Sequence, residues 1–395
     1  MKLRFILYLI GFSAFVGSLG QNLYSPLLGQ VEQHLHTTGY MVNLSVSLFT
    51  MALAVMQIVF GPLADRKGRR KILLPALIVY AAASLGCAFA PSVWQLLCFR
   101  LLQGISSAVI PVVAAAVIGD LFQGKDRAKG MGTYQLVLML APAIGPLIGG
   151  IIGQHYGYQG AFIFLAVLVL AVWAVSAAVL PETKPEHSGQ RRFSLTNFSV
   201  IAKHPISGTI LLYGFVQCFA YFVFLVFLPQ MLSQLYHFMP AQTGVVLLSL
   251  SGCSITSIKL GTWIQNYFGN RRALFYSFLL HALTVILFAF TAMSSLSFLI
   301  LAVCLFGFAM GLTMSMPSVI LTELFSEERA TAIGVYNLVR YLGMALGPML
   351  GSVLYAHGSF TLLFLTSGIL FLTAVLVGKG WMGSFAMAAP KKVEG

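Results

Sequence analysis

Long apolar runs separated by short polar stretches follow one another along the whole chain. A helix that crosses a membrane needs about 20 mostly apolar residues, and twelve runs meet this requirement. The longest polar stretch, Pro181 to Lys203, separates the sixth run from the seventh and predicts a linker. We predict membrane-spanning helices at about 5–29, 41–64, 72–90, 93–121, 129–154, 160–180, 206–232, 241–264, 272–292, 296–324, 330–356 and 359–381.

The composition agrees with a chain covered by lipid. Hydrophobic residues make up 58% and charged residues only 8% of 395 residues, and the mean hydropathy is +0.90. Soluble domains carry about a quarter charged residues. We therefore expect an all-α polytopic membrane protein. The predicted linker divides its twelve spans into two six-helix bundles, for which the internal repeat described below predicts pseudo-symmetry.

The positive charges predict how the spans are oriented. The formal net charge of +13 could indicate a nucleic-acid partner, but 20 of the 23 Lys and Arg residues fall at the N-terminus, in the loops after even-numbered runs, or in the C-terminal tail. This is the positive-inside pattern, and the remaining three, Arg100, Lys259 and Arg340, lie within predicted helices. We therefore predict cytoplasmic N- and C-termini in a bacterial-type inner membrane, and no nucleic-acid partner.

An internal repeat relates the two halves. The segment from Gly119 to Pro146 aligns with Thr322 to Pro348 after one single-residue gap, so that Asp120 matches Glu323. Duplicated halves with the substrate held between them are a transporter architecture. We predict a first bundle at 1–180, a cytoplasmic linker at 181–205, a second bundle at 206–382 and a tail at 383–395.

A Gly- and Arg-rich segment joins the second and third predicted helices. Asp65 ends the second helix, where an Arg or a helix N-terminus could pair with it, and Gly68 allows a tight turn. Gly61 would let another helix approach closely. We predict a conformational switch formed by Gly61, Asp65, Arg66, Gly68, Arg69 and Arg70.

This segment resembles the signature loop of the major facilitator superfamily. The stretch Leu96 to Gly104, with Arg100 and Gln103, resembles the helix-4 motif of that superfamily. The stretch Ala141 to Gly150 resembles its antiporter motif and adds Gly145, Pro146 and Gly149 to the predicted switch. The three motifs together resemble the twelve-helix drug:proton antiporter branch, which implies export by alternating access.

Polar side chains within the predicted spans are candidates for substrate binding, since such residues are costly in lipid. Arg340 lies about 15 Å into its helix by the helical rise, with no carboxylate in the same stretch. Tyr, Gln and Met side chains could line a broad amphipathic site. The predicted substrate-binding residues are Asn22, Arg100, Gln103, Gln217, Tyr221, Met314, Asn337 and Arg340.

The proton carrier is the least defined feature. Many related exporters carry an acid, which binds the proton, near the position of Asn22. In this chain the position is Asn, whose amide cannot titrate. The predicted coupling residues are Asp120, Glu323 and, as the resemblance implies, Arg100. His281 falls mid-helix and is interpreted as a partnered or lipid-facing histidine, although histidine titrates near neutral pH.

These patterns predict a monomeric exporter of small amphipathic compounds, driven by an ion gradient, and neither an enzyme nor a protein with a cofactor or metal. The missing mid-membrane acid favours anionic, zwitterionic or neutral substrates. The alternatives are an exporter of siderophore-like or lipid-linked anions, a metabolite uniporter or importer, and a non-transporting membrane sensor.

Overall fold

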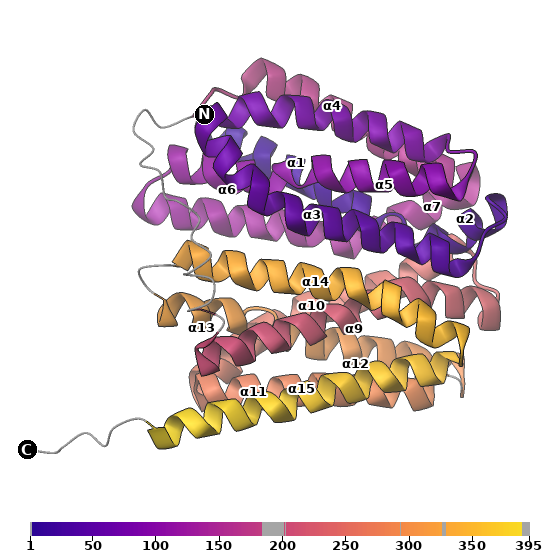
Figure 1. The fold of residues 1–395 in the computed structure, drawn as a ribbon, viewed down its shortest axis with the longest axis vertical. Coiled ribbons are helices and arrows are strands. Elements are labelled where there is room, and N and C mark those ends of the chain that lie inside the picture. The colour runs from indigo at the N-terminus through magenta and orange to yellow at the C-terminus, as the bar shows by residue number, and fades with distance from the viewer. Residues whose placement is uncertain (1, 184–200, 202, 293, 326–328, 389–395) are drawn as a thin grey trace, which may run out of the picture. The chain divides into compact units, whose positions relative to one another are not determined.

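The computed structural model describes residues 2–183, 201, 203–292, 294–325 and 329–388. All elements in this part of the chain are helices, as Figure 1 shows. The polytopic helical fold predicted from the sequence is therefore confirmed. Most of the predicted linker (184–200 and 202) and the last residues of the predicted tail (389–395) lie outside the described residues.

The chain divides into two compact units. The first comprises Met1–Phe193 and Leu225–Leu248, and the second comprises Ser194–Phe224 and Ser249–Gly395. The predicted boundaries at 180 and 206 stay a prediction.

The first unit contains the N-terminal helices. In this unit α1 packs along α7, α4 packs on α7 and α5, and α3 packs on α5. The elements are α1 (Lys2–Asn22), the 3-10 helix η1 (Ser25–Leu27), α2 (Leu28–His34), α3 (Gly39–Lys67), α4 (Arg69–Ala88), α5 (Val93–Ser107), α6 (Val109–Leu121) and α7 (Gly124–Val179).

The second unit contains the C-terminal helices, with α11 packed between α15 and α12. Its elements are α11 (Asn270–Thr291), α12 (Leu296–Thr313), α13 (Met316–Leu324), α14 (Arg329–Ala356) and α15 (Phe360–Ala388). Two long helices, α9 (Pro205–Tyr236) and α10 (Pro240–Phe268), contribute residues to both units.

Eleven helices of the described chain are long and apolar enough to cross a membrane, compared with twelve predicted spans. The difference arises in α7, where Lys129–Val179 forms one run of 51 residues. Such a run would extend about 76 Å, far beyond the roughly 30 Å of a bilayer core. Gly157 interrupts it with φ 67° and ψ 178°, so α7 contains both predicted spans, 129–154 and 160–180.

Helices in the two units start and break at corresponding positions. The side chain of Ser92 caps the start of α5, and that of Ser295 caps the start of α12, as Ser at this position commonly does. The fourth span is interrupted at Ala108, between α5 and α6, and the tenth at Met314–Ser315, between α12 and α13.

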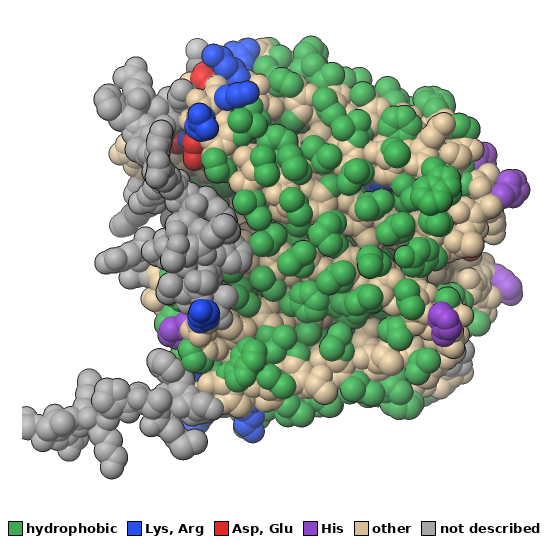
Figure 2. All heavy atoms as spheres, viewed as in Figure 1, with side chains coloured by type: hydrophobic (Ala, Val, Ile, Leu, Met, Phe, Trp, Pro, Cys, Tyr) green, Lys and Arg blue, Asp and Glu red, His purple; other side chains and the backbone are tan. Residues whose placement is uncertain are grey.

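The surface agrees with a lipid environment. In the unit that contains the N-terminus, hydrophobic side chains cover much of the visible face, and the visible Lys and Arg side chains gather toward one end of the helices (Figure 2). Large apolar side chains such as Val55, Val59 and Leu136 are exposed. Exposed apolar surface of this kind marks an interaction site in a soluble protein, but it is expected where helices face acyl chains.

Candidate transport site and conformational switch

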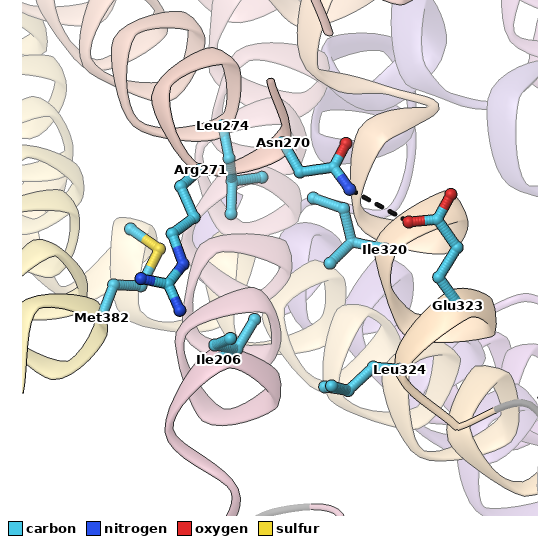
Figure 3. Close-up of a pocket in the computed structure, with 8 residues that line it drawn as sticks. All are labelled: Ile206, Asn270, Arg271, Leu274, Ile320, Glu323, Leu324 and Met382. Atoms are coloured by element: carbon cyan, nitrogen blue, oxygen red, sulfur yellow. Dashed lines mark hydrogen bonds between the residues drawn. The ribbon is translucent and has the colours of Figure 1, made fainter. Parts of the chain in front are cut away.

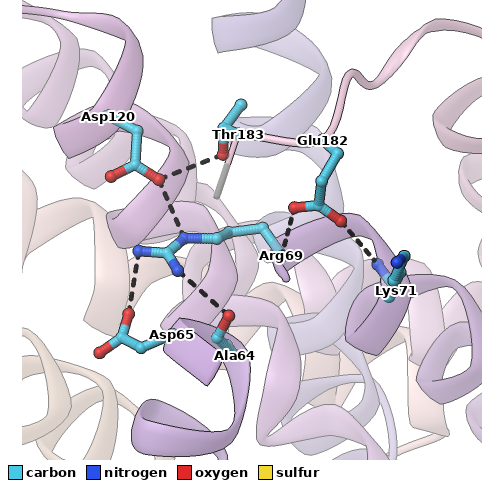
Figure 4. Close-up of polar contacts among 7 residues, drawn as sticks. All are labelled: Ala64, Asp65, Arg69, Lys71, Asp120, Glu182 and Thr183. Atoms are coloured by element: carbon cyan, nitrogen blue, oxygen red, sulfur yellow. Dashed lines mark hydrogen bonds and ion pairs between the residues drawn. The ribbon is translucent and has the colours of Figure 1, made fainter. Parts of the chain in front are cut away.

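Arg69 is the centre of a charged cluster at the junction of α3 and α4. Its Nη2 lies 2.9 Å from Oδ1 of Asp65, and its Nε lies 2.9 Å from Oδ2 of Asp120. Its Nη1 donates to the carbonyl of Ala64 at 3.1 Å, and Figure 4 shows these partners around one guanidinium. The Asp120 side chain is 17% exposed and that of Asp65 57%. Because water screens exposed ion pairs, the Arg69–Asp120 pair contributes more to stability than the Arg69–Asp65 pair.

Glu182, which follows α7, joins the same cluster through the backbone of α4. Its Oε1 accepts from the amide of Arg69 at 2.7 Å, and its Oε2 accepts from the amide of Lys71 at 3.4 Å. The hydroxyl of Thr183 donates to Asp120 at 3.1 Å. A carboxylate at a helix N-terminus satisfies free N–H groups and complements the helix dipole. The cluster therefore connects the end of α3, the start of α4, the end of α6 and the segment that follows α7.

The predicted switch residues differ in how closely they are packed. Gly68 has φ 107°, and a Cβ there would approach Oε2 of Glu182 to 2.5 Å, so a side chain would be both strained and crowded. Gly61, which we expected to allow a close helix approach, has no atom of the described chain within 4 Å of a Cβ position. Arg70 donates to the carbonyl of Ala177, and Arg66 is exposed.

Arg100 lies in the interior of the first unit and is 0% exposed. Its Nη1 donates to the carbonyl of Gly20 at 3.1 Å and to Oε1 of Gln103 at 2.6 Å. The amide of Gln103 in turn donates to the hydroxyl of Ser84 at 2.8 Å. These bonds link α5 to α1 and α4.

Two aromatic rings take the place of a carboxylate beside Arg100. The guanidinium carbon lies 4.3 Å from the ring centroid of Phe49 and 4.9 Å from that of Tyr24. Cation–π contacts become stronger when the cation is desolvated. Within the described residues, Nε and Nη2 have no hydrogen-bond partner, so the charge is only partly compensated.

The glycines of the helix-5 motif lie on the face of α7 that contacts α1. A Cβ on Gly145 would lie 3.0 Å from Cβ of Asn22, and a Cβ on Gly149 would collide with the carbonyl of Leu23. Asn22 donates to the carbonyl of Ser18 at 2.9 Å and is buried. These glycines therefore allow α7 and α1 to pack backbone against backbone.

The same segment of α7 contacts the start of α10 within the first unit. A Cβ on Gly150 would collide with the carbonyl of Pro240, and a Cβ on Gly244 would lie 2.7 Å from the carbonyl of Pro146. Pro146, a predicted switch residue, therefore presents its carbonyl to a glycine.

In the second unit, Arg340 of α14 lies beside α9. Its Nε donates to Sγ of Cys218 at 3.3 Å, and its guanidinium carbon lies 5.4 Å from the ring centroid of Tyr336. Gly214 makes room for both, since a Cβ there would approach Tyr336 to 2.5 Å and Cγ of Arg340 to 3.2 Å. Arg340 is half-buried.

Gln217 of α9 is hydrogen-bonded to Thr313 at the end of α12, with Nε2 donating to Oγ1 at 2.6 Å. Tyr221, one turn further along α9, is buried, while Met314 and Asn337 are half-buried. Gln217 stays a predicted substrate residue, and nothing in the sequence indicated its contact with Thr313.

The second unit carries a counterpart of the Arg69 cluster in which amides and one carboxylate are hydrogen-bonded. Gln265 donates to Oδ1 of Asn270 at 2.9 Å, and Asn270 donates to Oε2 of Glu323 at 3.0 Å. Beside them lies a pocket of about 320 Å³, shown in Figure 3, with Arg271 and apolar side chains such as Leu274 in its lining. An amide replaces the guanidinium, so Glu323 has no cation in this hydrogen-bonded chain.

Sequence reasoning missed Glu182 and Thr183 although both stand in a polar break directly after an apolar run. Their partners are more than 50 residues away in the chain, so no local spacing indicates the contact. In the described part of the chain no group of three or more His, Cys, Asp or Glu could hold a metal ion.

Comparison with known proteins places this geometry in a family. A profile of the Major Facilitator Superfamily matches residues 10–258 and 210–392. The chain is 24% identical over 357 residues to the uncharacterized MFS-type transporter YdgK of Bacillus subtilis, covering 87% of this chain and 88% of YdgK. It is 29% identical over 178 residues to MFS antiporter QDR3 of Candida albicans and 30% identical over 175 residues to citrate exporter 1 of Aspergillus niger.

The last two alignments cover 45% and 44% of this chain but only 26% and 33% of those relatives. Among solved structures, a bacterial homologue of the human lysosomal transporter Spinster, crystallised in an inward-facing and occupied conformation, matches with a TM-score of 0.80. That match covers 98% of this chain and 97% of the other at 15% identity, which shows a shared fold.

Proposed function

Because the chain belongs to the Major Facilitator Superfamily, we propose that it exports small amphipathic compounds across the membrane in exchange for protons. As a member of this superfamily it is a secondary transporter rather than an enzyme, and it binds a small-molecule substrate in the membrane. The direction of transport, the coupling ion and the substrate class belong to the proposal.

The observation that carries the export direction is the packing of α7 on α1. Gly149 has no room for even a Cβ against the Leu23 carbonyl, and it belongs to the stretch that resembles an antiporter motif. Close backbone contact through small residues allows helices to slide or tilt while they remain packed. Citrate exporter 1, a distant relative whose name gives export, supports the same direction.

The charges of the candidate residues favour substrates that are anionic, zwitterionic or neutral. Asn22 stands where many related exporters carry an acid, and Arg340 is a half-buried cation next to Cys218. A cavity with a cation and no mid-membrane acid attracts anions more than cations. Citrate exporter 1 is a distant relative whose name gives an anion as cargo.

We assign the substrate contacts to the predicted residues according to their burial. In the second unit, Arg340 and Asn337 of α14 and Met314 beside α12 are half-buried and can contact a ligand directly. Gln217 and Tyr221 of α9 are buried, so they would contact a ligand only after neighbouring side chains have moved.

In the first unit Arg100, Gln103 and Asn22 are buried, and contact with a substrate would require a rearrangement there. The Arg69 cluster and the glycines of α7 would control that rearrangement. Asp120 and Glu323, with Arg100, remain the coupling residues predicted from the sequence. We also propose that the protein is a monomer of the inner membrane with cytoplasmic termini. Its two halves would rock about a central site during transport.

The test uses everted membrane vesicles that contain the full chain and an imposed pH gradient. Radiolabelled chloramphenicol, citrate and quinidine serve as neutral, anionic and cationic probes. We expect accumulation of the neutral or anionic probe that stops when the gradient is collapsed. Accumulation that is indifferent to collapse would exclude proton coupling, and accumulation of quinidine alone would exclude the substrate class.

Arg340→Ala tests the site in the same vesicles, with Arg272→Ala as the control because Arg272 is an exposed arginine in the first turn of α11. We expect loss of anion transport in the first variant and normal transport in the second. Normal citrate transport by Arg340→Ala would remove Arg340 from the site.

The main alternative is a uniporter or importer of a metabolite, for which flux would follow the substrate gradient in either direction. Siderophore-like or lipid-linked anions are a further substrate class that Arg340 could bind. Competition between such anions and labelled citrate would distinguish this class from simple carboxylates.

A further inference from the structure

His281 is a titratable residue in the centre of the second unit that the proposed function has not used. It lies about 16 Å along α11 from Asn270 by the helical rise, and it is 0% exposed. The rings of Phe306 and Phe371 lie on it at centroid distances of 4.9 and 5.0 Å. The interpretation as a lipid-facing histidine is therefore wrong, whereas the partnered alternative fits.

The hydrogen bonds of Thr313 determine which ring nitrogen carries the hydrogen. Two backbone carbonyls accept from the Thr313 hydroxyl, that of Met310 at 2.8 Å and that of Ala309 at 3.3 Å, and the shorter bond takes the single hydrogen of the hydroxyl. Its two lone pairs then accept from Nε2 of Gln217 at 2.6 Å and from Nδ1 of His281 at 3.5 Å. A threonine hydroxyl has one donor and two acceptor sites. With its hydrogen on a backbone carbonyl, Nδ1 of His281 is the donor in this contact, so we assign neutral His281 to the Nδ1–H tautomer.

The other nitrogen of His281 is then a base without a partner. Within the described residues, Nε2 is buried and makes no hydrogen bond. Buried polar atoms are almost always satisfied, and an exception with a free basic lone pair can accept a proton. The edges and faces of two aromatic rings give a resulting cation limited stabilisation.

Titratable groups lie on the helices around α11, but the charged ones do not contact the imidazole of His281. The hydroxyl of Tyr213 of α9 donates to a backbone carbonyl of α15. Lys379 of α15 is exposed. Glu323 of α13 accepts from Asn270, the first residue of α11. Among the described residues, no Asp, Glu, Lys or Arg contacts His281. Protonation therefore places an uncompensated charge in an apolar site, which is unfavourable unless the site opens.

Thr313 connects this base with the region proposed for substrate. It is the last residue of α12, at the interruption before α13. Gln217, its partner, and Met314, its neighbour, are both candidate substrate residues. A ligand that draws Gln217 away, or a movement at the interruption, would change the surroundings of His281.

We propose that Nε2 of His281 accepts and later releases the exchanged proton, and that Thr313 and Gln217 connect its protonation to the substrate region. In the uptake step the Nε2 lone pair binds a proton from water on one side of the membrane, and in the release step the same N–H bond breaks to water on the other. This inference rests on the proposed proton antiport and supplies the carrier that Asn22 cannot be.

The coupling residues predicted from the sequence are less suited to binding and releasing the exchanged proton. Asp120 is paired with Arg69, and Glu323 is exposed at the end of its helix. The guanidinium of Arg100 does not release its proton at physiological pH.

The first test needs no substrate. Full-length chain with ¹⁵N-labelled histidine is placed in lipid nanodiscs, and its resonances are followed by NMR from about pH 5 to pH 9, the range around histidine titration. The resonance missing in His281→Gln is that of His281. We expect the Nδ1–H tautomer at high pH and imidazolium at low pH. Observation of the Nε2–H tautomer, or of a neutral ring throughout, would overturn the proposal.

Variants of Thr313 keep this test decisive if His281→Gln does not fold. Thr313→Ser retains the hydroxyl and should keep the Nδ1–H signal, whereas Thr313→Val removes the acceptor and should mix the tautomers. Identical spectra from the two variants would contradict the hydrogen-bond assignment.

The second test uses the vesicle assay with labelled chloramphenicol and citrate. His281→Gln should reduce gradient-driven accumulation to the level seen after collapse of the gradient, while exchange of labelled for unlabelled probe continues. His357→Gln is the control, since His357 is exposed. If the wild type is indifferent to the gradient, the proposed antiport fails and the NMR result alone decides whether His281 binds a proton. If the wild type is coupled and His281→Gln remains coupled, only this inference fails.

Discussion

Replacing Gly149 with alanine adds one methyl group where α7 contacts α1. The new Cβ would overlap the carbonyl oxygen of Leu23, and a backbone carbonyl cannot rotate away as a side chain can. Overpacking of this kind costs about 1–3 kcal/mol. Alanine also gains about 1 kcal/mol over glycine within a helix, so we expect a net change from near zero to about 2 kcal/mol of destabilisation.

Gly132 provides a matched control on the same helix. No atom of the described chain lies within 4 Å of its Cβ position, so Gly132→Ala should gain the helix propensity of about 1 kcal/mol without a collision. The two variants share chemistry and helix, and their difference isolates the contact. That difference of about 1–3 kcal/mol corresponds to melting temperatures about 2–12 °C apart for units of this size.

The assay is thermal unfolding of the purified full chain in one detergent, followed by transport in vesicles. Gly149→Ala should melt below Gly132→Ala and transport more slowly than the wild type. Equal increases in melting temperature for both variants would show that α1 and α7 are not in backbone contact. That result would also remove the observation on which the export direction rests.

Three further substitutions test the first unit. Arg69→Met should lower the unfolding free energy by about 3 kcal/mol, because it leaves a partly buried carboxylate without its cation; unchanged melting would refute the pairing. Gly68→Ala should cost about 1–3 kcal/mol, since it forces a positive φ on alanine and displaces Glu182, and transport at the wild-type rate would contradict that contact. Gln103→Leu should cost about 3 kcal/mol by removing an acceptor from buried Arg100, and a variant as heat-resistant as the wild type would show that the acceptor is dispensable.

The spans were predictable because each apolar run is long enough to cross a bilayer, whatever its neighbours. The interruption at Ala108 was not, because residues 93–121 together are apolar enough to predict a single span. Ser106 and Ser107 before it and Pro111 after it are also tolerated within continuous helices, so they did not indicate a break. The joining of two predicted spans in α7 depends on the backbone conformation of Gly157 alone. Hydropathy reports burial in lipid and contains no information on such local geometry.

The candidate site was predictable in part. Pairing of Asp65 with an arginine was expected and is confirmed by Arg69. The stronger partner, Asp120, lies on a different helix, and the sequence does not indicate which helix ends meet. The role of Thr313 was missed for the same reason, because its partners Gln217 and His281 lie on separate helices.

The turn at Gly157 has a consequence for how the protein is made. Only one residue departs from helical conformation between the two spans of α7, so the second span cannot remain outside the bilayer once the first has crossed it. No Lys or Arg lies between Lys129 and Lys184, so orientation must be read from charges at the two ends of the pair. We therefore expect the two spans to enter the membrane together as a helical hairpin.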